Sequence, residues 1–507
     1  MTSTTEHRYK LDFEFEYCTP EQFSNKCQKN LQMIKDRMLA EVVSQLKCDD
    51  VSIGFVESLL GMGAGVNMNN GKLTPLINSI NNKNENLVKI LIDAGADVNM
   101  FNPLMYAIKN KQINIVKILL EAGANTNSED QALLKEACKI GNAEIVSLLL
   151  EKGGVDIRRL DGYENPLYLS FEFCHDEVFH LLLKHGADIN YIIKKFRLPL
   201  RHLCENGKYN MIKTLLEAGM NANEAMVHLK NDYDSDSDDY EEYEVFVPSI
   251  SVAVENGSTD IVKLLIEHGA DVSEKIREED TLLCLAIRKG HVEVAKALIG
   301  AGANIDEPDN KGVTPLMLSI KGRHEDIFKE LMARECDIMT KDENQWRAIH
   351  YAAGYGNDYM TKKLLEAGAD VNDGSMRTSP LLLSVYESNI ESFRVLIENG
   401  ADMNFQNDTY FPLYLACQRE NEEMIEMLIK YGADVNARRK KGDTAIMKAA
   451  ETCTPKIINL LVNAGADIHV RGEYGETPLS RARQNKDGYK NAEFLLRLGA
   501  GSYADTY

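Results

Sequence analysis

Histidine and cysteine are the side chains most often used for catalysis or metal binding, and here neither type forms a recognisable set. The ten cysteines are too widely spaced for a zinc site, and no two form a Cys-x-x-Cys pair. The 11 histidines include no His-x-x-x-His pair and no Ser/His/Asp or Cys/His/Asn pattern. We therefore expect no catalytic residue, no metal ligand and no cofactor, and we predict that the protein is not an enzyme.

Two glycine-containing segments could be mistaken for nucleotide-binding loops. In Gly61-Met62-Gly63-Ala64-Gly65 the glycines follow an expected helix over residues 55–60, whereas a phosphate-binding loop precedes its helix. Gly71-Lys72 lacks the first glycine of such a loop, and Leu73 stands where Ser or Thr is required. The first segment is interpreted as a helix stop, and no small-molecule substrate is expected.

The remaining polar candidates fit structural roles better than chemical ones. His202 and His350 are expected as neutral imidazoles that hydrogen-bond neighbouring backbone. Cys138, Cys204 and Cys417 fall at positions that require a small buried side chain. Scattered cysteines without a secretory leader are typical of reduced thiols, so we expect a cytoplasmic location, with a nuclear location or non-classical secretion as alternatives.

An acidic segment at residues 227–247 carries eight Asp or Glu residues between Asp232 and Glu244. Such a segment cannot pack as a core, so we predict a disordered insertion. It could tether a basic partner, or be phosphorylated at Ser235 and Ser237, which lie among the acids as in substrates of acidic-directed kinases.

The whole chain is acidic as well, with 57 Lys+Arg against 78 Asp+Glu and a formal net charge of −21. That balance disfavours nucleic acids and anionic membranes as partners, and favours a protein with a basic face. The basic run Arg438–Lys441 is interpreted as a solvated loop tip, with a nuclear-import signal as the alternative.

All these residues belong to units that repeat along the chain. The tripeptide Gly-Ala-Asp, or a near copy, recurs from Gly63 to Gly499 at gaps that cluster at 33 residues, with one gap of 50 at the insertion. Each copy follows apolar residues at helical spacing, and about 20 residues earlier stands a Thr-Pro-Leu-like start such as Thr314-Pro315-Leu316. Thr caps a helix, Pro fits its first turn and Gly ends it.

The unit is therefore helix, turn, helix, glycine stop and loop, and its apolar faces are buried only when units stack. A 33-residue unit with these two signatures resembles the ankyrin repeat over residues 51–507, as about thirteen repeats plus an N-terminal partial one. The resemblance implies an all-α helix-turn-helix solenoid with short hairpin-like loops. We expect a helical cap at 1–38, one sub-array at 39–226 and a second at 248–507, including a C-terminal capping repeat.

Departures from the repeat and its recurrent polar positions give further expectations. Glu335 replaces the stop glycine, so a non-glycine residue must take a positive φ there. The Asn of Gly-Ala-Asp-Val-Asn is expected to hydrogen-bond turn backbone; it recurs at Asn99, Asn190, Asn372, Asn404 and Asn436.

The resemblance implies binding through the loop tips and the concave helix surface. Exposed loop aromatics and Arg are typical of binding hot spots; the alternative is that each ring folds back over its own repeat. The candidates are Phe101, Tyr191, Phe196, Trp346, Arg347, Phe405, Tyr410, Phe411 and Tyr474, with Trp346 and Arg347 first.

These observations favour a non-catalytic protein–protein interaction scaffold or adaptor. Two alternatives stay open. One is a regulatory or host-directed effector that occupies a target protein. The other is an enzyme confined to residues 1–50 or to the insertion, although each segment is short for a catalytic pocket.

Overall fold

The computed structural model describes most of the chain: residues 20–45, 50–68, 73–126, 131–153, 157, 165–196, 199–223, 225–233, 240–276, 280–374, 378–407, 409–485 and 488–501. The chain forms two compact units, residues 1–199 and 200–507. The sequence predicts a division at the acidic insertion, residues 227–247, but that segment lies inside the second unit.

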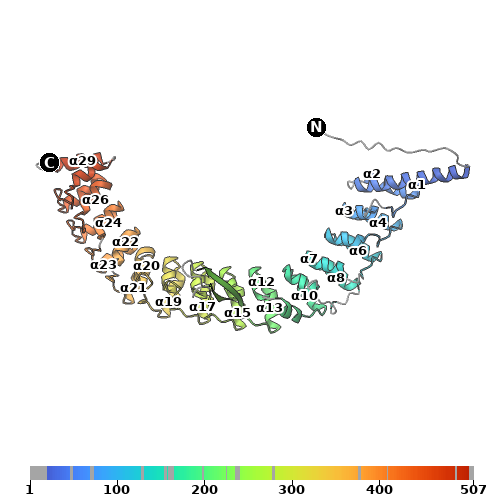
Figure 1. Ribbon diagram of the computed structural model, residues 1–507, viewed down its shortest axis with the longest axis horizontal. Helices are drawn as coiled ribbons and strands as arrows, with labels where there is room; N and C mark the ends of the chain where they lie inside the picture. The colour runs from blue at the N-terminus through green and yellow to red at the C-terminus, as the bar shows by residue number, and fades with distance from the viewer. Residues whose placement is uncertain are drawn as a thin grey trace. The chain divides into compact units, whose positions relative to one another are not determined.

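The first unit is built from short helices in pairs, after one long N-terminal helix (Figure 1). Its helices are α1 (Pro20–Gln45), α2 (Asp50–Gly61), α3 (Pro75–Asn81), α4 (Glu85–Asp93), α5 (Pro103–Lys109), α6 (Ile113–Glu121), α7 (Ala132–Ile140), α8 (Ala143–Gly153), α9 (Pro166–Glu172), α10 (Asp176–Lys184) and α11 (Asn190–Lys195).

The second unit continues the helix pairs and adds two hairpins. Its helices are α12 (Pro199–Glu205), α13 (Tyr209–Glu217), α14 (Ser249–Glu255), α15 (Thr259–Glu267), α16 (Leu282–Arg288), α17 (Val292–Gly300), α18 (Pro315–Lys321), α19 (Glu325–Ala333), α20 (Ala348–Tyr355), α21 (Asp358–Glu366), α22 (Pro380–Tyr386), α23 (Ile390–Glu398), α24 (Pro412–Gln418), α25 (Glu422–Lys430), α26 (Ala445–Thr452), α27 (Pro455–Asn463), α28 (Pro478–Gln484) and α29 (Tyr489–Arg497). The strands are β1 (Ala225–Tyr233), β2 (Tyr240–Pro248), β3 (Lys275–Ile276) and β4 (Asp280–Thr281).

Local sequence determines where the helices begin and end. Thr314 Oγ1 accepts a hydrogen bond from the Met317 N–H at 3.3 Å, and Pro315 occupies the first turn of α18. The stop glycines take positive φ, as Gly302 does at 91°. Glu335 replaces one of them and takes φ 55°, as the sequence predicts.

The core of each unit is the seam between stacked helices. In the second unit the first helices of successive repeats, α14 to α28, pack in chain order, and the second helices pack beside them. Cys138 in the first unit and Cys204 and Cys417 in the second are fully buried, which confirms the predicted filler role. Burial raises the pKa of the Cys138 thiol well above its usual value.

Turn asparagines tie each repeat to the next. Asn372 accepts a hydrogen bond from the Asp402 N–H at 2.7 Å and donates one to the Gly400 carbonyl at 3.2 Å. Asn99, Asn404 and Asn436 accept the corresponding N–H of the following turn, which confirms the expected role. Asn190 differs, because it is the first residue of α11 and donates to Asp188.

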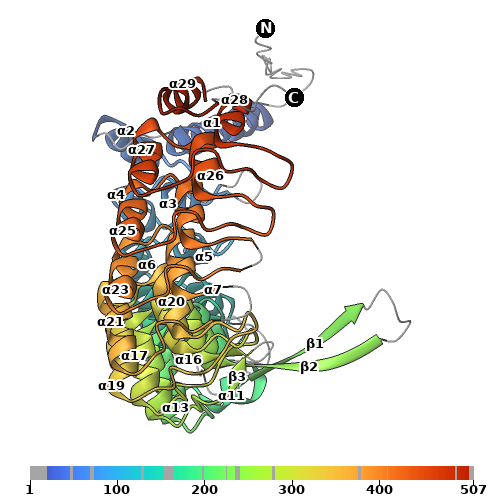
Figure 2. The same ribbon diagram turned by 90° about the vertical axis from the view of Figure 1, so that its left-hand side faces the viewer.

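The acidic insertion contains a β-hairpin, so the prediction that residues 227–247 are wholly disordered is wrong. Strand β1 pairs antiparallel with β2, from Ala225 opposite Pro248 to Tyr233 opposite Tyr240, and Figure 2 shows the pair leaving the helical stack. The sequence carries strand-favouring residues at both hairpin bases, Met226-Val227 and Val245-Phe246-Val247, which the acid count obscured. Ser235 and Ser237 lie outside the described residues.

Helix α1 packs on α2 and α3 at the start of the first unit. Leu39 and Val43 are its fully buried residues, and the buried Asp36 accepts the Gly65 N–H at 2.6 Å. Leu31 and Met38 of the same helix are 54 % and 42 % exposed.

Candidate functional site

The site is built from one position of the repeat, the residue directly before the N-cap of each first helix, which we call the loop-end residue. From α16 to α28 in the second unit, the loop-end residues are Asp280, Val313, Trp346, Thr378, Tyr410, Asp443 and Glu476. The loop closes on this residue: the Asp342 N–H donates to the Trp346 carbonyl at 2.9 Å, and the Arg439 N–H donates to the Asp443 carbonyl at 2.9 Å. Its side chain is thereby held beside the start of the first helix.

A groove of about 540 Å³ lies along three consecutive loop ends, Trp346, Thr378 and Tyr410. Its apolar lining consists of Leu382, Leu383 and Tyr386 from α22 and Leu415 from α24. The three leucines are nearly fully buried, whereas Tyr386 is 47 % exposed. The remaining lining residues are Glu343, Asn344, Gln345, Glu387 and Asn407. Figure 1 shows α20, α22 and α24 in succession.

The Trp346 wall is fixed by contacts within its own repeat. The indole is parallel to the His350 ring, with centroids 6.3 Å apart, and edge-on to Tyr351 at 5.8 Å. The buried Asp342 carboxylate accepts the Trp346 backbone N–H and the Tyr351 hydroxyl, both at 2.8 Å. Burial, together with that hydrogen bond, holds the pKa of Tyr351 well above its usual value.

Next to Trp346 lies a cluster of three polar side chains, Arg347, His350 and Asp373. The Arg347 guanidinium pairs with Asp373 at 2.6 Å and donates to the Met339 carbonyl at 2.9 Å. The Arg347 N–H donates to His350 Nδ1 at 3.3 Å, and His350 is fully buried. Burial lowers the pKa of His350, which outweighs the opposing effect of Asp373. His350 thus fills the predicted structural role, while the Arg347 side chain is held by Asp373 and the Met339 carbonyl.

Several predicted aromatic residues also fold back rather than facing outward. Phe411 is only 2 % exposed, because it is the N-cap of α24 and packs on Tyr414 at 5.7 Å, so it is not a surface ring. Phe196 is half-buried against Phe171 at 4.7 Å and Tyr168 at 5.7 Å. Tyr191 in α11 and Phe405 are half-buried as well.

Phe101 and Tyr474 are the exposed members of the predicted set, at 41 % and 77 %. They lie in different units. The structure therefore brings together only Trp346 and Tyr410 of the predicted residues, in the groove.

The sequence analysis did not identify the part of the groove lining that α22 contributes, of which Tyr386 is the most exposed residue. It also did not identify the two carboxylates, Glu343 and Glu387. A usable signal was present in the repeat spacing. Trp346, Thr378 and Tyr410 are 32 residues apart, so a small side chain stands between two aromatic ones at the same repeat position. Aligning loop ends rather than searching for loop aromatics finds this pattern.

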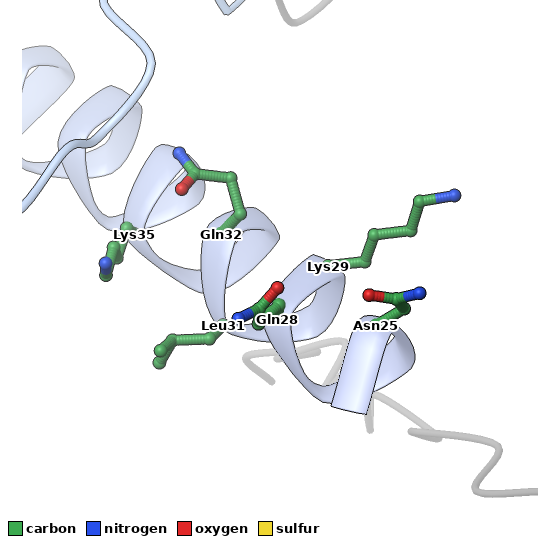
Figure 3. Close-up of a pocket in the computed structure, with 6 residues that line it drawn as sticks. All are labelled: Asn25, Gln28, Lys29, Leu31, Gln32 and Lys35. Atoms are coloured by element: carbon green, nitrogen blue, oxygen red, sulfur yellow. The ribbon is translucent and has the colours of Figure 1, made fainter. Parts of the chain in front are cut away.

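A second hollow, of about 700 Å³, runs along α1 in the first unit and has the wrong chemistry for a binding site (Figure 3). All six of its lining residues belong to that one helix, and five of them are polar: Asn25, Gln28, Lys29, Gln32 and Lys35. Figure 3 shows Lys29 and Asn25 extending away from the helix. Lys35 and Gln32 are used structurally, because they donate to the Met62 and Gly63 carbonyls at 2.7 and 2.8 Å.

Within the described ranges, no group of three or more His, Cys, Asp or Glu side chains is arranged to hold a metal ion. In that same part of the chain, every helix is too short or too polar to span a bilayer. The chemistry available in the groove is therefore that of aromatic rings, apolar surface and carboxylates.

Comparison with known proteins places the repeat pattern in a family. A family model described as ankyrin repeats (3 copies) matches residues 48–193 in two overlapping segments and residues 250–505 in five. A solved structure, the ankyrin repeat domain of human ASB11, matches 43 % of this chain and 98 % of its own at 23 % identity, with a TM-score of 0.39.

Three curated proteins are similar over shorter stretches. They are the E3 ubiquitin-protein ligase KEG of Arabidopsis thaliana (33 % identity over 101 residues, 19 % of this chain and 6 % of that protein), the B-cell lymphoma 3 protein homolog of Mus musculus (30 % over 159 residues, 30 % and 32 %) and the putative ankyrin repeat protein FPV014 of Fowlpox virus (29 % over 145 residues, 28 % and 29 %). The matches span at most about a third of these relatives.

Proposed function

Since the chain belongs to the ankyrin repeat family, we propose that it is a non-catalytic scaffold that binds protein partners, with the groove at Trp346, Thr378 and Tyr410 as its principal binding surface. The observation that carries the proposal is the row of loop ends. Two half-buried aromatic side chains flank a small one above a leucine floor, so apolar area is left open to a partner.

The lining suits a protein partner for two reasons. Trp and Tyr are rigid and amphipathic, and residues of this kind dominate the binding energy of protein interfaces. The Trp346 indole packs against His350 and Tyr351, and its backbone N–H is held by Asp342, so little conformational entropy is lost on binding.

The surrounding array would serve this groove as a scaffold. The asparagine ties between turns fix neighbouring loop ends relative to one another. We infer that α1, through Leu39 and Val43, caps the helical stack of the first unit, since solenoid ends require covering. An adaptor role, a cytoplasmic location and phosphorylation at Ser235 and Ser237 remain predictions.

The test is selection of binding peptides from a library of random linear peptides displayed on phage, with the full chain as bait. Peptides that bind the groove should lose affinity about 30-fold or more for Trp346→Ala and for Tyr386→Ala, the change that about 2 kcal/mol implies. Tyr386 is exposed, so its substitution leaves the fold intact.

The matched control is Tyr474→Ala, which removes a 77 % exposed loop aromatic outside the groove. It should leave the affinity of the same peptides unchanged. If every selected peptide binds Trp346→Ala and Tyr386→Ala as well as the unaltered chain, the groove is not the binding surface.

A further inference from the structure

The charges around the groove point to the chemistry of its partner. Glu343 and Glu387 are exposed at its edge, and none of the lining residues is Lys or Arg. One oxygen of Glu387 accepts the Tyr355 hydroxyl at 3.2 Å; among the described residues its other oxygen and the Glu343 carboxylate have no hydrogen-bonding partner. The edge of the groove is therefore anionic, with carboxylate oxygens available to a donor.

Aromatic rings in this region already bind cations of the chain itself. The Arg419 guanidinium lies 4.5 Å from the centre of the Tyr386 ring, and Arg439 lies 5.4 Å from Tyr410 and 4.6 Å from Tyr414. Within the described part of the chain, Trp346 has His350 and Tyr351 as ring neighbours and no such cation. Trp is the ring that attracts cations most strongly.

We propose that the groove binds a protein segment that places a Lys or Arg side chain at Trp346, between Glu343 and Glu387, with an adjacent apolar side chain on Leu382, Leu383 and Leu415. This inference rests on the proposed function, since it specifies the partner of the same groove. Charge complementarity favours this occupant over an acidic one, because the edge carries two carboxylates and the chain a net charge of −21.

Arg419 and Arg439 are the charges that oppose this assignment, and Arg439 is paired with Asp443 at 3.5 Å, so Arg419 is the one to remove. Arg419 is exposed and lies over Tyr386, which also lines the groove. A cationic side chain entering the groove is repelled by it, so Arg419→Gln should raise the affinity of a basic peptide by about two- to threefold. An acidic peptide should instead lose affinity for that variant.

The experiment uses dye-labelled versions of selected peptides whose binding Trp346→Ala abolishes, measured by fluorescence anisotropy on the full chain. The selected sequences should share a Lys or Arg beside an apolar residue. Replacing that residue by norleucine, which keeps the aliphatic stem and removes the charge, should weaken binding about tenfold. In the Glu343→Gln/Glu387→Gln chain the same replacement should change affinity less than twofold.

The outcomes separate the two proposals. Peptides that need Trp346 but share no basic residue, or a norleucine penalty that is equal in both chains, overturn this inference and leave the proposed function standing. If the selected peptides instead share an acidic residue, Arg419 is the group that recognises them, and this inference is overturned as well. Peptides that depend on Tyr386 but not on Trp346 overturn only this inference. If no selected peptide depends on Trp346 or on Tyr386, both proposals fail together.

Discussion

Two stretches of the second unit use their loop-end residues in opposite ways. At Trp346, Thr378 and Tyr410 the loop ends leave an apolar groove open. At Asp443 and Glu476 the loop ends are carboxylates that share one arginine, Arg481, at 3.0 and 3.3 Å. Asp280 follows the second pattern, paired with Arg288 at 2.5 Å.

The loop backbone is shared by the two stretches only in part. At Trp346 and at Glu476 the backbone N–H four residues earlier donates to the loop-end carbonyl, both at 2.9 Å, whereas at Tyr410 the donor is Asn407, three residues earlier, at 3.1 Å. The loops at Trp346 and Glu476, which close alike, differ in one side chain, which either pairs within the fold or stays available to a partner. The repeat framework thus supplies position, while the loop-end residue determines whether a repeat binds or only stabilises.

The largest effect is expected when the small loop-end residue Thr378 is replaced by an aromatic one, as in the repeats on either side of it. Thr378→Trp should lower the affinity of groove-binding peptides by about 30-fold or more, because the indole occupies the space between Trp346 and Tyr410. The free energy of unfolding should change by less than about 0.5 kcal/mol, since aromatic rings are accepted at this position in the flanking repeats.

The control for Thr378→Trp is Val313→Trp, which adds the same bulk at a loop end outside the groove lining. It should leave peptide affinity unchanged, as measured by fluorescence anisotropy. A Thr378→Trp chain that retains full affinity would show that the small loop-end residue does not create the binding surface.

The next effect concerns the carboxylate loop ends. Arg481→Met should lower the free energy of unfolding by about 1–2 kcal/mol in urea titration, because Asp443 and Glu476 lose their shared partner. The side chains are 14 %, 21 % and 26 % exposed, so the cost lies between that of surface and fully buried pairs.

Arg497→Met provides the matched control for Arg481→Met. Its pair with Glu493 is largely exposed, at 74 % and 60 %, so its loss should cost less than about 0.5 kcal/mol. Equal costs for the two variants would mean that the loop-end carboxylates at Asp443 and Glu476 are not stabilised by Arg481.

Much of the fold could be predicted from sequence, because helix caps, stop glycines and turn asparagines act locally. The site could be predicted only in part. Trp346 and Tyr410 are recognisable as loop aromatics, but Phe411 has the same neighbourhood in sequence and is buried, since one residue of offset turns a side chain from the loop into the helix start. Tyr386 is the last residue of helix α22 rather than part of the long loop before it, and it reaches the groove only through stacking of repeats.

A pH effect should appear on the Trp346 side of the groove. Burial lowers the pKa of His350 below its usual value of 6.5, so the unfolded chain takes up this proton at a higher pH than the folded chain. The free energy of unfolding should therefore fall as pH drops below about 6.5, by at most about 1.4 kcal/mol per pH unit from this one group. Asp373, Arg347 and Asp342 are the charges that face it.

His350→Gln isolates that contribution, because Gln has no proton to take up and its carbonyl can still accept the Arg347 N–H. Urea titrations between about pH 5 and pH 7, a range that spans the ordinary histidine pKa, should give a shallower dependence for the variant than for the unaltered chain. Parallel profiles would remove His350 from the account of stability at this loop.

The smallest effect is expected from backbone strain in the loop that ends at Trp346, which the loops ending at Val313, Asp443 and Glu476 avoid. Gln345 takes φ 63°, whereas Gly312, Gly442 and Gly475 stand at the same loop position with φ 73°, 77° and 79°. Gln345→Gly should raise the free energy of unfolding by about 0.5 kcal/mol, because relief of about 1 kcal/mol at positive φ is partly offset by the greater freedom of glycine in the unfolded chain. Gly475→Gln is the reverse change without a steric clash, since nothing lies within 4 Å of an added Cβ, and should cost a similar amount. If Gln345→Gly is instead destabilising, the Gln345 side chain must contribute to the folded loop, and the groove loop differs from its neighbours in more than its loop-end residue.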